Sequence, residues 1–123
     1  FSFILALSAT MLFVACKPDP GPGGEAVING VAKHHDDEIP NTKVYIKYGT
    51  LESPGLDPGV YDDSTTAGAD ARFQFSGLER GEYYVYGIGY DAAIDTTVRA
   101  GVPVNIEEAG EVIEILLPVT EGD

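Results

Sequence analysis

The segment YYVYGIGY, residues 83–90, carries aromatic side chains that could bind a sugar by stacking on its apolar face. Successive side chains of a β-strand point to opposite faces, so if Tyr83 faces a core, the other face carries three tyrosines, Tyr84, Tyr86 and Tyr90. Exposed aromatic stripes also contact other proteins. The same residues could instead be structural and pack on a neighbour such as Tyr45 across a sheet. We take Tyr84, Tyr86 and Tyr90 as the candidate ligand face, with a glycan or a protein as its partner.

The single cysteine, Cys16, stands between an apolar run and a Pro/Gly-rich run. The run before it, FSFILALSATMLFVA (residues 1–15), has no charge and is shorter than the about 20 apolar residues that a membrane-spanning helix needs. It fits the apolar region of a secretory signal, and because the chain starts at Phe1 we expect a truncated signal peptide in helical form. A lone cysteine cannot form an internal disulfide, which leaves its thiol for alkylation.

The three residues before Cys16, Phe13, Val14 and Ala15, resemble the lipobox of bacterial lipoproteins, with Phe13 where leucine is usual. The resemblance implies that Cys16 is lipidated, becomes the first mature residue and anchors the chain to a membrane. Residues 16–24, which include KPDPGPGG, would then form a flexible tether. In bacterial lipoproteins, an aspartate directly after the lipidated cysteine retains the protein in the inner membrane, and this chain has Lys17 at that position. We therefore expect an outer-membrane location, which is compatible with exposure at the cell surface. The alternatives are an ordinary secretory signal that ends near a cysteine and a buried apolar helix.

Two acidic regions could bind cations. The cluster HHDDE, residues 34–38, combines imidazoles with carboxylates, but adjacent residues of an extended segment point to opposite sides. Four aspartates fall in or beside predicted loops, and oxygen-rich loops are what Ca²⁺ prefers; they are Asp57, Asp62, Asp63 and Asp70. They lack the spacing of a calcium loop. We therefore predict no resident metal and no cofactor, and keep a calcium-binding module as an alternative.

Charge and motifs exclude several function classes. Twenty acidic residues against seven basic residues give a formal charge of −13, which repels nucleic acid and anionic lipid headgroups. The serines lie in no nucleophile elbow, and no glycine-rich loop precedes a helix. We therefore predict that the protein is not an enzyme and that nucleic acid is not its partner.

Residues 25–119 alternate between apolar and polar in short runs separated by turn residues, which predicts β-strands rather than helices. The period of two predicts that Val44 and Ile46, Phe73 and Phe75, and the set Ile113, Ile115 and Leu117 face a core. We expect one seven-stranded antiparallel β-sandwich over 25–119, followed by a short tail over 120–123. The expected strands are 26–33, 42–49, 60–67, 71–78, 82–91, 96–108 and 111–119.

The run TTAGADARFQFSGLERGEYYVYGIGYD, residues 65–91, resembles a known family. Its Phe73, Phe75, Leu78, Gly81 and Tyr83 match the signature G-x-F-x-F-x-x-L-x-x-G-x-Y of carboxypeptidase regulatory-like domains, which have a transthyretin-like or prealbumin-like sandwich related to immunoglobulin-like folds. Ala71 stands where the family has glycine in a tight turn. The resemblance implies an accessory module of an envelope or secreted protein, as in the small lipoproteins of Bacteroides-type bacteria.

Together these observations predict a non-catalytic lipoprotein of the cell envelope whose β-sandwich is a structural or binding accessory module. The first alternative is a surface lipoprotein that binds carbohydrate or protein through the tyrosine face. The second is the calcium-binding module formed by the acidic loops.

Overall fold

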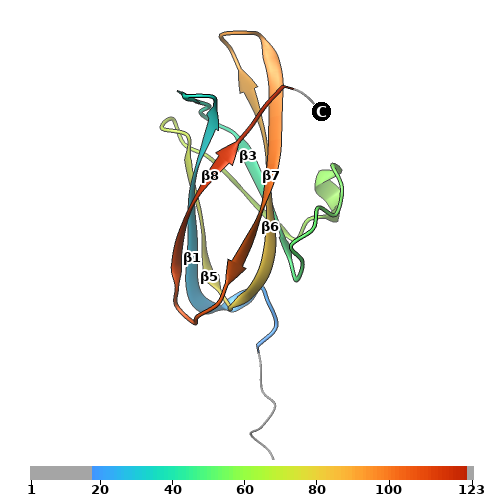
Figure 1. Cartoon of the computed structure of the whole chain (residues 1–123), viewed down its shortest axis with the longest axis vertical. Helices are drawn as coiled ribbons and strands as arrows, with labels where there is room; N and C mark the ends of the chain where they lie inside the picture. Colours follow the sequence, from blue (N-terminus) through green and yellow to red (C-terminus); the bar gives the residue numbers. More distant parts are fainter. Residues whose placement is uncertain (1–17, 122–123) are drawn as a thin grey trace, which may run out of the picture.

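The computed structural model describes residues 18–121, which fold as two β-sheets packed face to face (Figure 1). The β-sandwich predicted from the alternating pattern is therefore confirmed. In this part of the chain, no helix has the length and apolar character needed to cross a membrane. The expected signal helix and Cys16 lie outside the described residues. The strands are β1 (Pro22–His34), β2 (Asp37–Glu38), β3 (Lys43–Tyr48), β4 (Asp63–Thr66), β5 (Arg72–Leu78), β6 (Gly81–Asp91), β7 (Thr96–Ile106) and β8 (Val112–Pro118).

One sheet has the order β2-β1-β5 with β8 also paired to β1, and the other has the order β4-β3-β6-β7. Eight strands are present instead of seven because the segment expected to be only a turn, HHDDEIPN, forms the short β2 in a tight hairpin with β1. The prediction of a wholly antiparallel sandwich was wrong for one pair. After β7 the chain crosses to the other sheet, where β8 runs parallel to β1 from Val27↔Val112 to Lys33↔Pro118.

The core lies between the two sheets and contains the residues that the period of two placed there. Val44, Ile46, Phe73, Phe75 and Leu117 are all buried. Ile113 and Ile115 pack against this cluster from β8 at its margin. A regular alternation that matches the pleat fixes the register, because a slip by one residue would expose every one of these side chains.

The ordered domain begins earlier than Glu25, within the segment expected to be a tether. Pro22 already belongs to β1, and the backbone N–H of Gly21 donates to the Tyr83 hydroxyl at 2.8 Å. That hydroxyl in turn donates to the carbonyl of Glu79 at 2.5 Å, which closes the β5–β6 turn. Gly81 has a φ of 146°, and a Cβ at this position would lie 2.6 Å from Pro20. Only glycine fits there, which explains its place in the signature motif.

Ala71, the departure from the family signature, adopts the conformation for which glycine is favoured. Its φ is 66°, and its N–H donates to the carbonyl of Gly68 at 3.0 Å to close the turn before β5. A left-handed conformation costs a non-glycine residue about 1 kcal/mol. The turn therefore forms at this position despite the substitution.

Candidate functional site

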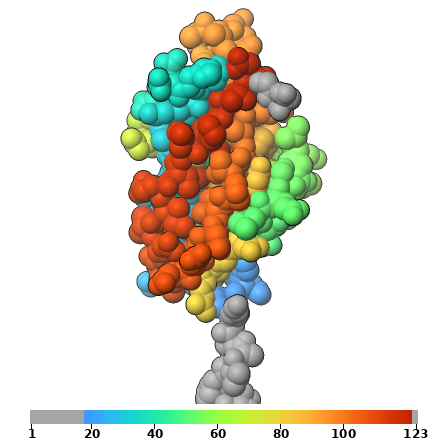
Figure 2. All heavy atoms as spheres, in the orientation of Figure 1, coloured from blue at the N-terminus to red at the C-terminus, as the bar shows by residue number. Residues whose placement is uncertain are grey.

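A cavity of about 540 Å³ lies on the outer face of the sheet β4-β3-β6-β7, on the side away from the core. It is bordered by the loop that follows β3 and by the residues that follow β8. Figure 2 shows the loop in green beside β7 in orange, with part of β6 visible between them. We call this space the Tyr84 cavity, and its lining residues are Ser53, Leu56, Tyr84, Tyr86, Thr97, Arg99, Ala100, Gly101, Thr120 and Glu121.

The floor of the Tyr84 cavity comes from outward-facing residues of β6 and β7. Tyr84 is half-buried and lies over Gly101, where a Cβ would come within 2.3 Å of the Tyr84 hydroxyl. The missing side chain at position 101 therefore makes room for the Tyr84 ring. Because β6 is paired on both sides, with β3 and with β7, the ring is held on rigid backbone rather than on a loop.

One wall of the cavity is the loop between β3 and β4, which is fixed by a cluster of tyrosines. Tyr61 stacks on Tyr86 with ring centroids 5.4 Å apart and an interplanar angle of 18°. Tyr45 contacts both rings, at 5.9 Å from Tyr61 and 6.3 Å from Tyr86. The Tyr61 hydroxyl donates to the carbonyl of Gly55 at 2.9 Å. Burial raises the pKa of Tyr61, so its hydroxyl keeps the proton that it donates to Gly55 well above neutral pH.

Tyr86 lies beneath this wall and is only 3% exposed, so the prediction that it belongs to an exposed face was wrong. The covering residue, Tyr61, comes from a loop whose path cannot be inferred from the alternation of β6. The buried Tyr86 hydroxyl has no hydrogen-bond partner among residues 18–121. Nearly all buried polar groups in proteins are hydrogen-bonded, so this hydroxyl is an exception, although it is closed to the cavity by the covering loop.

The opposite wall consists of Thr120 and Glu121. The backbones of Arg99 and Thr120 exchange two hydrogen bonds, at 2.8 and 3.0 Å, which hold this segment on β7. Beyond it, His34 lies buried between two carboxylates: its Nδ1 is 2.8 Å from Asp91 Oδ2 and its Nε2 is 2.6 Å from Glu121 Oε1. The second contact has the distance of an ion pair without the alignment of a hydrogen bond.

The two carboxylates change the titration of His34. Its hydrogen bond to Asp91 is the main cause that raises the pKa of His34, against the opposing effect of burial. The same bond lowers the pKa of Asp91. The pKa of Glu121 is lowered first by a backbone hydrogen bond and further by His34. The protonated imidazole therefore links β1, β6 and the segment after β8.

Tyr90, the third tyrosine of the candidate face, does not lie with the other two. It is 52% exposed and lines a separate hollow with Ile39 and Pro40. The structure therefore divides the predicted stripe into a cavity pair, Tyr84 and Tyr86, and a separate Tyr90. The sequence did not point to Arg99 or Glu121. Arg99 shares the outward face of β7 with Thr97 and Gly101, a placement that depends on strand register.

The four aspartates considered for Ca²⁺ each accept a hydrogen bond from a different backbone N–H. The backbone donors are Gly59, Tyr48, Ser64 and Arg72 for Asp57, Asp62, Asp63 and Asp70 respectively. Within residues 18–121, no group of three or more histidine, cysteine or acidic side chains is arranged to hold a metal ion. The geometry offers the calcium alternative no support.

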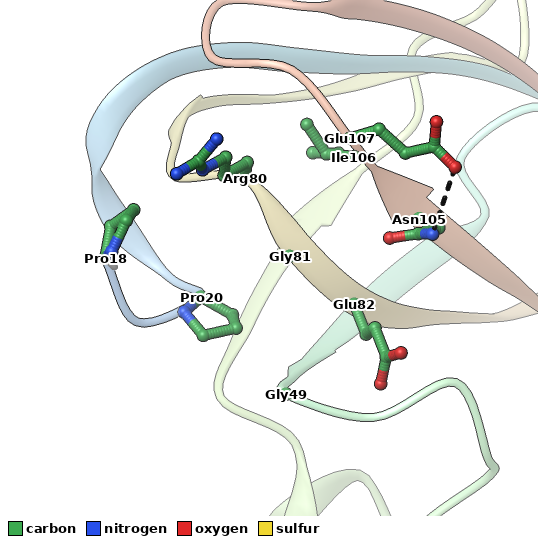
Figure 3. Close-up of a pocket in the computed structure, with 9 residues that line it drawn as sticks. All are labelled: Pro18, Pro20, Gly49, Arg80, Gly81, Glu82, Asn105, Ile106 and Glu107. Atoms are coloured by element: carbon green, nitrogen blue, oxygen red, sulfur yellow. Dashed lines mark hydrogen bonds between the residues drawn. The ribbon is translucent and has the colours of Figure 1, made fainter. Parts of the chain in front are cut away.

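A second cavity, of about 440 Å³, lies at the end of the sandwich where the described chain begins. Figure 3 shows Pro18, Pro20 and Arg80 on one side of it, with Asn105 and Glu107 on the other. Asn105 Nδ2 donates to Glu107 at 3.5 Å. Among residues 18–121, no aromatic side chain lines this cavity, so the described lining lacks a surface on which a sugar ring could stack.

Comparison with known proteins shows a likeness of fold. No family model and no curated protein matches the chain. A crystal structure of a proposed carbohydrate-binding protein from Pseudomonas aeruginosa is similar to it, with a TM-score of 0.52. The two are 20% identical in sequence, and the match covers 80% of this chain and 91% of the other. This likeness supports the β-sandwich architecture.

Proposed function

We propose that this domain is a non-catalytic carbohydrate-binding module and that the Tyr84 cavity is its binding site. The observation that carries the proposal is the half-buried aromatic ring of Tyr84 in a cavity that polar side chains also line. The apolar face of a pyranose ring would stack on Tyr84. The Tyr86 hydroxyl is closed to solvent, so a sugar hydroxyl would reach it only if the covering loop shifts. The side chains of Ser53 and Thr97 add hydrogen-bonding groups at the rim.

The lining of the cavity favours binding over hydrolysis. Most glycoside hydrolases place two carboxyl groups on either side of the scissile bond. Glu121 is the only carboxylate among the lining residues that the structure describes, and it already faces His34. The fold likeness to a proposed carbohydrate-binding protein agrees with this proposal by analogy, since one fold can serve many functions.

We further propose that the domain is a carboxypeptidase regulatory-like module of an outer-membrane lipoprotein anchored at Cys16. The signature residues have the roles expected of that family: Phe73, Phe75 and Leu78 are buried, Gly81 has positive φ, and Tyr83 closes the turn. The described chain enters β1 at one end of the sandwich and leaves β8 towards the other (Figure 1), so an N-terminal anchor would leave the segment after β8, which forms one wall of the cavity, away from the membrane. Intact mass of protein expressed with a complete signal in a Gram-negative host should show an acylated form beginning at Cys16. A Cys16→Ser variant that gives the same mature mass would exclude the anchor.

A glycan array followed by calorimetry tests the carbohydrate-binding proposal. For any glycan bound by the native domain, Tyr84→Ala should weaken binding about tenfold, because it removes the stacking surface. Tyr90→Ala is the matched control, since Tyr90 is an exposed tyrosine of the same strand outside the Tyr84 cavity. Thermal melting of both variants checks folding. Equal loss in the two variants, or no binding to any glycan by the native domain, would refute the proposal.

A further inference from the structure

The geometry points to a more specific ligand, and we infer that the Tyr84 cavity selects sugars that carry a carboxylate, with Arg99 as the residue that binds it. This inference rests on the proposed carbohydrate-binding function and names the class of glycan: uronic acids and other acidic sugars. It assigns Arg99 a role in ligand specificity rather than in stabilising the fold.

Arg99 is placed to face a ligand that stacks on Tyr84. It projects from the outer face of β7, is half-buried, and lines the same cavity as Tyr84 and Thr97. Its backbone, not its side chain, makes the two hydrogen bonds to Thr120 that hold the far wall. The guanidinium is therefore not needed to build the cavity.

The guanidinium forms no ion pair with any carboxylate of residues 18–121, although the protein is strongly acidic. With twenty acidic residues against seven basic residues, an arginine has many potential partners. Lys47, by comparison, approaches Asp62 at 3.6 Å. An unpaired, half-buried guanidinium lacks the bidentate carboxylate partner for which its planar donors are suited.

Glu121, which lines the same cavity as Arg99, pairs with another residue. It is the one carboxylate of the cavity lining, and its Oε1 lies 2.6 Å from His34 Nε2. Because the pKa of His34 is raised, the imidazole stays protonated further towards neutral pH and offsets the Glu121 charge. His34 thereby leaves Arg99 without a carboxylate partner among the residues that the structure describes, and it reduces the repulsion that an anionic ligand would meet at this wall.

The overall charge of −13 opposes the binding of an acidic sugar, so the local contacts must overcome it. The negative charge disfavours anions over the whole surface. An acidic sugar should therefore bind only where stacking on Tyr84 and pairing with Arg99 act together. A carboxylate attached directly to a pyranose ring suits this arrangement, because the ring and the charge are held at a fixed short distance. A charge-assisted, bidentate pair in a partly buried cavity should favour the acid over its neutral counterpart about tenfold or more.

Matched ligands that differ only in charge test the inference. Calorimetry should compare oligogalacturonate and oligoglucuronate with their methyl esters and with neutral galactose and glucose oligomers. We expect at least one acidic oligomer to bind about tenfold more tightly than its ester. Arg99→Gln should abolish that difference while retaining the weaker binding of the ester. Arg80→Gln is the matched control, because Arg80 lines the other cavity.

The outcomes separate the inference from the function on which it rests. Equal binding of acid and ester, or an acid preference that survives Arg99→Gln, would overturn the role of Arg99 and leave carbohydrate binding intact. Absence of binding to every acidic, esterified and neutral oligomer would overturn both. Thermal melting checks that Arg99→Gln is folded. We expect it to be, because the Arg99–Thr120 hydrogen bonds use backbone atoms that the substitution leaves in place.

Discussion

Replacing Tyr83 by phenylalanine tests how the start of the domain is held to its core. The Tyr83 ring is fully buried, and its hydroxyl makes two bonds: it accepts from the Gly21 N–H at 2.8 Å and donates to the Glu79 carbonyl at 2.5 Å. Phenylalanine retains the ring and removes only the hydroxyl. The change therefore isolates the hydrogen bonds that join Gly21 to the β5–β6 turn.

The expected loss follows from the two bonds. Each hydrogen bond contributes about 1 kcal/mol net, and leaving the buried Gly21 N–H without a partner adds a desolvation cost of about 1 kcal/mol. The total is about 2–3 kcal/mol. For a domain of this size, 1 kcal/mol lowers the melting temperature by about 4–5 °C. Tyr83→Phe should therefore lower the melting temperature by about 10 °C.

Differential scanning calorimetry at neutral pH measures this change. Tyr90→Phe is the control, because it removes a hydroxyl from a tyrosine of the same strand that is 52% exposed, and it should shift the melting temperature by less than about 2 °C. If the two variants melted within a degree of each other, Gly21 and the residues before it would contribute nothing to stability. The reasoning that places the start of the domain ahead of Glu25 would then fail.

Two further predictions concern the walls and floor of the Tyr84 cavity. The pKa of His34 is raised in the fold, mainly by its hydrogen bond to Asp91, so its stabilising contribution is complete below about pH 6.5 and is lost as the pH rises through the folded pKa. The melting temperature should fall between pH 6 and 9, and His34→Gln should flatten that slope; an unchanged slope would contradict the pairing. Gly101→Ala should displace the Tyr84 ring, since the new Cβ would lie 2.3 Å from its hydroxyl. Glycan binding should weaken about tenfold, as for loss of the ring itself, and unaltered affinity would show that the ring does not contact the ligand.

The alternating residues predicted the core because burial in a sandwich depends on local periodicity. Phe73, Phe75 and Leu117 could be assigned to the interior from their own strands alone. Tyr86 could not, because its burial comes from Tyr61, on a loop whose return over the sheet depends on contacts distant in sequence. Arg99 was missed for a related reason. Its proximity to Tyr84 depends on the register of β6 against β7, which cannot be inferred from either strand alone.

The pairing of β8 also required knowledge of the three-dimensional arrangement. Its residues predicted a strand with one buried face, and they form one. The partner strand, and the parallel direction, follow from the crossing between sheets after β7. A sequence with seven strand-like runs is compatible with either direction.

The parallel pair β1 and β8 also determines how the domain would respond to a pulling force. The chain enters β1 at one end of the sheet and leaves β8 at the other, with seven residue pairs between Val27↔Val112 and Lys33↔Pro118 (Figure 1). A load applied between the two termini acts along these strands, so the bonds between them are sheared together instead of being unzipped one at a time. Such a geometry gives mechanical resistance that equilibrium stability does not report, because forced unfolding depends on the unfolding rate. A module held at one end and loaded at the other would therefore unfold more slowly than one whose terminal strands unzip.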